Sequence, residues 1–160
     1  MVNDDVILRK IGKLKEYVYE LRRSKDITWE KYQKDVRARA FVERYIHIAI
    51  QNVFDIANHI ISYQGWKEPD TYREYFSVLA ENGVLPDEKV SDFQNMASFR
   101  NMLVHHYEKV DNEVVFAIFK NRLRDFDLFC EFILEYVKKM NREADLRGLR
   151  PAGSMEPVAR

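Results

Sequence analysis

The sequence is poor in the residues that break helices and in those that cross-link chains. It contains five glycines, four prolines and one cysteine among 160 residues. Most of the glycines and prolines fall between stretches with helical periodicity, which favours an all-α fold. The single cysteine, Cys130, excludes an internal disulfide and points to a reducing compartment, where it is either a core thiol or a reactive one.

The sequence also lacks an excess of charge of either sign, and it lacks long hydrophobic runs. Twenty-six basic residues offset 26 acidic ones, so the chain lacks the net positive charge of many nucleic-acid-binding proteins. An anionic ligand would therefore have to bind at a local patch of positive charge. The N-terminus is charged throughout and no uncharged run is long enough to cross a bilayer, so we expect a cytoplasmic protein without a membrane segment. Five arginines are candidates for a local patch or for an ordinary solvated face: Arg37, Arg39, Arg44, Arg122 and Arg124.

Apolar residues recur at helical spacing along most of the chain. In the first segment they are separated by four, three, four and three positions, which places them on one stripe of a helix. The second segment is expected to be one long helix that kinks before it ends at Gly65. The predicted helices cover residues 4–23, 28–63, 71–83, 86–106 and, after a cap at Asp111, 112–141.

These segments predict an up-and-down bundle of four or five helices in a single domain, residues 1–142. The remainder, residues 143–160, mixes glycine, proline, serine and charge. It lacks a periodic apolar face, so we expect a flexible tail.

One short stretch near the end of the fourth helix concentrates polar chemistry. Residues 100–107 read RNMLVHHY. At 100° per residue, Arg100 and His105 bracket a face that contains Asn101 and lies away from the apolar stripe. His106 leans towards the bundle interior. His105 is therefore the histidine that is placed to act on a ligand.

Arginine and histidine together suit phosphodiester chemistry. The guanidinium keeps its charge and can brace a phosphate whose charge grows in the transition state, while the imidazole can move a proton. A 2′-hydroxyl nucleophile on the adjacent ribose removes the need for a metal and selects RNA over DNA. The pair alone is weak evidence for catalysis. Arg and His near a helix C-terminus also donate hydrogen bonds to the last carbonyls and interact favourably with the helix dipole.

The full string resembles the signature of the HEPN superfamily in its HepT-like toxin branch: arginine, a polar residue, three residues, histidine, any residue, tyrosine. Four residues match in turn: Arg100, Asn101, His105 and Tyr107. A second stretch, ERYIHIAIQNVFDIANHII at residues 43–61, is similar to the long second helix of these toxins. The resemblance extends over residues 3–140 and includes the order of the helices.

The resemblance implies a metal-independent RNA endonuclease that needs no cofactor and acts as a homodimer, with the Arg and His helices of two subunits forming a shared cleft. Arg100 and His105 are then catalytic, and Asn101 supports them. It also implies a partner antitoxin, a minimal nucleotidyltransferase (MNT), that transfers AMP to the hydroxyl of Tyr107. A bulky anion there would obstruct the cleft and compete for Arg100. The alternative for Tyr107 is an aromatic side chain that closes the end of the core.

Other polar residues support weaker hypotheses. Glu43 with His47, and Asp55 with His59, are spaced i, i+4, so each pair can ligate a metal or form a hydrogen bond. Di-metal sites in helical bundles usually use Glu-x-x-His, which the sequence lacks. We therefore predict no metal site and interpret Asp55, His59 and His106 as structural or cleft-lining residues.

Two other functions stay compatible with the residues alone. One is a non-catalytic helical module that docks a partner or a nucleotide. The other is a metal-dependent helical-bundle enzyme. Degradation of RNA in excess chelator separates both from the ribonuclease hypothesis.

Overall fold

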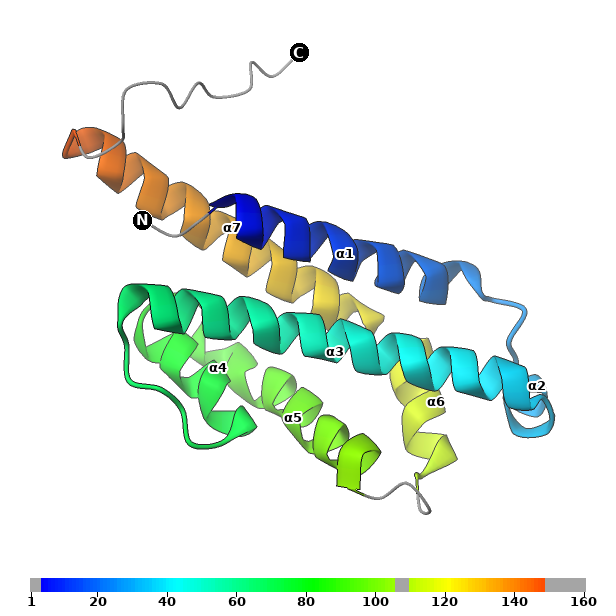
Figure 1. Ribbon diagram of the computed structural model, residues 1–160. Helices are drawn as coiled ribbons and strands as arrows, with labels where there is room; N and C mark the ends of the chain where they lie inside the picture. Colours follow the sequence, from blue (N-terminus) through cyan, green and yellow to red (C-terminus); the bar gives the residue numbers. More distant parts are fainter. Residues whose placement is uncertain (1–3, 106–109, 149–160) are drawn as a thin grey trace, which may run out of the picture.

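The computed structural model describes residues 4–105 and 110–148, and every regular element in these ranges is helical. The all-α prediction is confirmed (Figure 1). The elements are α1 (Asp4–Arg23), α2 (Trp29–Lys34), α3 (Val36–Gln64), α4 (Tyr72–Glu81), the 3₁₀ helix η1 (Asp87–Lys89), α5 (Val90–His105), α6 (Asn112–Asn121) and α7 (Leu123–Leu146).

The long helix α3 is the centre of the fold. It contacts every other α-helix of the described chain. In Figure 1, α1 and α7 lie along one side of α3, and α4 and α5 lie along the other. A helix with so many neighbours must be apolar over much of its surface, which explains the buried residues along its whole length.

The stripe predicted for the first helix is confirmed. Its five apolar residues are all buried against the core: Ile7, Ile11, Leu14, Val18 and Leu21. The opposite face of α1 is exposed, and Leu8 there is 50% accessible to solvent. Because α1 packs through one face only, its local pattern was sufficient to define it.

Aromatic rings join three helices at the centre of the core. Phe129 on α7 is fully buried. Its ring meets Phe93 of α5 edge-on at 5.8 Å and Phe76 of α4 edge-on at 6.4 Å. Edge-to-face pairs add to the stabilisation that burial alone provides. The same ring therefore ties α4, α5 and α7 together.

The predicted second helix is broken at Asp35, which corrects the expectation of one continuous element. The backbone of Asp35 is extended, with φ −97° and ψ 105°, and its carboxylate accepts hydrogen bonds from the N–H groups of Arg37 and Ala38. Asp35 is thus the N-cap of α3. Val36, which continues the apolar spacing across the break, is 66% exposed.

The predicted fifth helix is likewise broken, at Arg122, so the described residues contain seven α-helices rather than four or five. Arg122 has φ −119° and ψ 6°, and no side chain caps α7 there. At its other end α7 continues to Leu146, past the domain boundary predicted at residue 142. Residues 149–160 of the predicted tail lie outside the described residues. None of the described helices is both long enough and apolar enough to cross a membrane.

Cys130 lies inside the bundle on α7. Its side chain is 2% exposed, and burial raises the pKa of the thiol to about 11. A thiol that stays protonated at neutral pH is a poor nucleophile. The structure therefore supports the interpretation of Cys130 as a core residue.

Candidate functional site

Arg100 packs on the ring of Tyr72 in α4, which in turn packs against Phe54 in α3. These two rings are here called the Arg100 shelf. The guanidinium carbon of Arg100 lies 3.8 Å from the centroid of the Tyr72 ring. Tyr72 is the first residue of α4 and packs edge-on against buried Phe54 of α3, with ring centroids 4.8 Å apart. A guanidinium above a tyrosine ring is held by a cation–π attraction of about 1 kcal/mol. The shelf therefore fixes the position of the charge.

One donor of Arg100 is unused. Its Nε is buried and has no hydrogen-bond partner among the described residues. Buried polar groups are normally paired, because leaving a donor unsatisfied costs free energy. A ligand oxyanion that reaches this nitrogen would gain a charge-assisted hydrogen bond.

His105 and Asn101 face solvent on the last two turns of α5. Both side chains are exposed, as the helical wheel predicted, whereas Arg100 is half-buried and turned towards α4. Five residues of helix separate Arg100 from His105 by about 7.5 Å along the axis. Within one chain the two positions are therefore more than one helical turn apart.

His106 and Tyr107 lie outside the described residues, which exclude 106–109. Their predicted positions, His106 towards the interior and Tyr107 beside Arg100, stay predictions.

Asp55 and His59 lie on α3 and are partly buried. Asp55 forms an ion pair with Lys10 of α1 at 3.9 Å and accepts a hydrogen bond from Gln51. Burial lowers the pKa of His59, and the charge of Lys10 lowers it further, so both effects favour the neutral imidazole. The contacts of Asp55 fit its structural interpretation, whereas Nε2 of His59 is buried without a hydrogen-bond partner among the described residues.

The pair Glu43 and His47 is divided between two environments. Glu43 accepts a hydrogen bond from the hydroxyl of Tyr32 on α2, at 3.4 Å. His47 instead lines a hollow farther along α3. In residues 4–105 and 110–148, no three His, Cys, Asp or Glu side chains gather closely enough to hold a metal ion.

That hollow, here called the α3 hollow, has a volume of about 250 Å³. It is lined by Arg44, His47, Ile48, Gln51, Asn52 and Asp55. Burial lowers the pKa of His47, and the charges of Arg44 and then Arg100 lower it further. From the sequence, Arg44 was a candidate for a positive patch or a solvated face, His47 for a metal ligand or a hydrogen bond, and Asp55 for a structural or cleft-lining residue. Their recurrence at intervals of three and four was the signal for a shared polar face.

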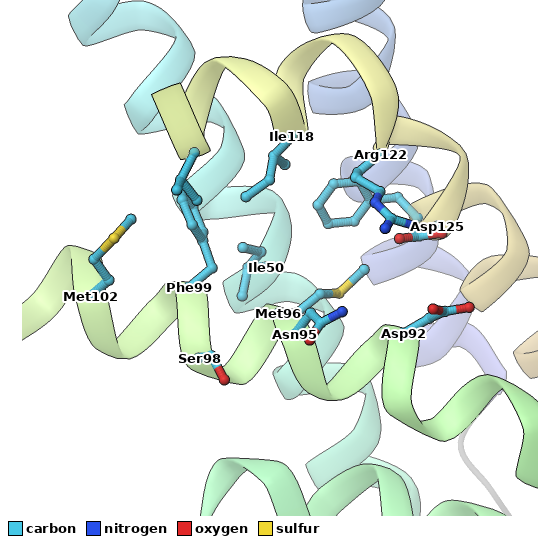
Figure 2. A pocket seen from close by; sticks show the side chains of 12 residues that line it. Ile50, Asp92, Asn95, Met96, Ser98, Phe99, Met102, Ile118, Arg122 and Asp125 are labelled. Atoms are coloured by element: carbon cyan, nitrogen blue, oxygen red, sulfur yellow. The ribbon is translucent and has the colours of Figure 1, made fainter. Parts of the chain in front are cut away.

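A second, larger pocket lies between α5 and α6, with a volume of about 370 Å³ (Figure 2). Its floor is mostly apolar and includes Phe99 and Ile118, while Arg122 and Asp125 lie at one end. Burial raises the pKa of Asp125, and the neighbouring charge of Asp92 adds to this effect. Arg122, at the break between α6 and α7, is one of the lining residues, and this break was not expected from the sequence.

Comparison with known proteins gives the family of the chain. Residues 7–147 match the family described as HepT-like ribonuclease. A curated relative from Shewanella oneidensis, named mRNA nuclease HepT, is 25% identical over 130 residues, covering 81% of this chain and 97% of the relative. Another from Aphanizomenon flos-aquae, named tRNA nuclease HepT, is 24% identical over 140 residues, covering 88% and 95%.

A solved structure shares the fold. It contains the tri-AMPylated HEPN toxin of Shewanella oneidensis in complex with an MNT antitoxin. The TM-score is 0.74 at 24% identity, with 82% of this chain and 98% of the toxin chain covered. The fold and the enzyme class implied by the sequence resemblance are thus confirmed. The chain belongs to the HepT-like ribonuclease family.

Proposed function

We propose that this protein is the RNA endonuclease toxin of a HEPN/MNT toxin–antitoxin pair, that it works in the cytoplasm without a metal, and that an MNT antitoxin silences it. The family membership and the names of the relatives support this proposal. The observation that carries it is Arg100, held on Tyr72 with a free buried Nε, five positions before an exposed His105.

The proposed reaction is transesterification within the RNA strand. His105 removes the proton of a 2′-hydroxyl, whose oxygen then bonds to the adjacent phosphorus. The bond from phosphorus to the 5′-oxygen breaks, and that oxygen takes up a proton. The products are a 2′,3′-cyclic phosphate and a 5′-hydroxyl end. Arg100 stabilises the charge that grows on the non-bridging oxygens, and Asn101 supports it by a hydrogen bond.

The proposed active unit is a homodimer. Asn101 and His105 form an exposed polar face of α5 that a two-fold axis can place against its own copy. A second histidine then becomes available to protonate the leaving oxygen while the first acts as the base. The two tasks need opposite protonation states, so two imidazoles serve better than one.

The direct test is cleavage of RNA by the purified protein in excess EDTA. We expect undiminished cleavage and 2′,3′-cyclic phosphate ends, detected by mass spectrometry. A strand with 2′-deoxyribose at the cleaved position should stay intact, because the nucleophile is missing. Loss of activity with chelator would favour a metal-dependent enzyme, and inactivity under all conditions would favour a binding module.

Tyr107 is the proposed site of AMP transfer. Tyr107→Phe removes the hydroxyl that accepts AMP but leaves Arg100 and His105 in place. We expect the variant to cleave RNA at nearly the wild-type rate and to be toxic in cells even when the antitoxin is present. The measurement is cell growth with and without the antitoxin. Equal neutralisation of the variant and the wild type would contradict modification at this residue.

A further inference from the structure

We propose that the α3 hollow is a nucleotide subsite of this ribonuclease, with a phosphate bound at Arg44 and His47 and a base facing Gln51 and Asn52. This inference rests on the proposed RNA substrate and extends the binding surface beyond the Arg100 and His105 motif.

The hollow lies on the side of α3 that faces away from the protein core. Of its six lining residues, only Ile48 is apolar. The positions recur at intervals of three and four, so they lie on one face of the helix. The buried residues of α3, such as Ile46 and Val53, lie on the opposite face. A concave surface that brings a few polar groups close together is typical of a ligand site.

One edge of the hollow adjoins the Arg100 shelf. His47 and Phe54 are seven residues apart, which is nearly two helical turns, so they share a flank of α3. Phe54 supports Tyr72, and Tyr72 holds the guanidinium of Arg100. His47 therefore lies on the same side of α3 as Phe54, where α4 and α5 pack near Arg100. A strand that contacts Arg100 can continue into the hollow.

The charges at this edge suit a phosphate. Burial lowers the pKa of His47, and the two cations that lower it further are Arg44 on α3 and Arg100 on α5. An imidazole in a positive field gains when an anion binds, because the anion offsets both the repulsion and the burial. Arg44 is exposed and offers a second guanidinium to the same anion.

The other end of the hollow offers groups that read bases. Gln51 and Asn52 are half-buried amides, which donate and accept hydrogen bonds at the edges of unpaired bases. Asp55 closes this end, about 12 Å from His47 along the helix axis. Its ion pair with Lys10, at 3.9 Å, partly offsets its charge.

The test measures binding of a fluorescent 2′-O-methyl RNA oligonucleotide, which has no nucleophile and cannot be cut. We expect Arg44→Ala and His47→Ala each to weaken binding about tenfold, and Arg44→Ala to reduce the salt slope by about one. The matched control is Arg142→Ala, which removes an exposed arginine on α7. Binding by the Arg44 and His47 variants that equals the control would overturn the proposal.

Two further measurements keep the outcome unambiguous. Circular dichroism checks that each variant folds, and His47→Gln, which keeps the size of the side chain without its ring, should also weaken binding. In a randomised RNA library, Asn52→Ala should redistribute cleavage among flanking bases, and an unchanged distribution would overturn base reading in the hollow. If the wild type binds through Arg44 and His47 but cuts nothing, the catalytic proposal fails and the subsite stands.

Discussion

Replacing Arg100 by alanine should lower kcat/KM for RNA cleavage by about 10²–10³-fold, the usual cost of removing a donor that stabilises transition-state charge. The loss should be large because the guanidinium is preorganised. Tyr72 holds it at 3.8 Å, and its Nε is buried without a partner in the described chain. Little reorganisation is then required when the phosphate becomes more charged.

Arg100→Lys should recover little of this activity. A lysine keeps the charge but lacks the planar fork that binds two phosphate oxygens and stacks on a tyrosine ring. Single-turnover cleavage of a defined oligonucleotide measures the chemical step directly. His105→Ala, which removes the proposed base, should cost about 10²–10⁴-fold in the same assay. Cleavage that persists at the wild-type rate in both alanine variants would point to a contaminating nuclease and refute the assignment.

Phe129→Ala should lower the free energy of unfolding by about 3–5 kcal/mol, the usual cost of truncating a buried phenylalanine. The ring is fully buried and touches both Phe76 and Phe93, so its loss leaves a cavity where α4, α5 and α7 meet. A change of this size is a large part of the stability of a domain.

Urea unfolding followed by circular dichroism measures this effect. The control is Leu8→Ala on the exposed face of α1, which should stay within about 0.5 kcal/mol of the wild type. If the two variants were equally stable, the three helices would not share the core described above. A fall in the slope of the denaturant dependence would instead indicate a change in the compactness of one of the two states.

Local patterns were enough where a helix packs through one face. The α1 stripe was predicted and is buried, and the exposure of Asn101 and His105 follows from the geometry of a single helix. These features need only the sequence of the element itself. The order of the long segments could be derived for the same reason.

The helix breaks show where local reasoning fails. At Asp35 the apolar spacing continues through Val36, yet the carboxylate competes for backbone N–H groups and starts a new helix. A cap signal was present there and was outweighed by periodicity. At Arg122 no glycine, proline or capping side chain marks the break. Phe119 just before the break and Leu123 just after it are both buried, so the apolar pattern carries no sign of the break.

The environment of Arg100 could not be predicted either. Tyr72 and Phe54 lie far from it in the sequence and reach it only when α3, α4 and α5 pack together. The same holds for the influence of Arg100 on His47. The identity of the motif was therefore accessible from the sequence, but its orientation and its neighbours were products of tertiary structure.

The deep burial of Cys130 makes its thiol a probe for transient opening of the helical bundle. Because the sequence contains a single thiol and that thiol is 2% exposed, a sulfhydryl reagent can label it only in molecules whose bundle has separated around α7. The labelling rate in native buffer then reports how often the domain opens around Cys130. Comparing that rate before and after the proposed dimerisation or the proposed antitoxin binding would show how strongly each association suppresses this opening.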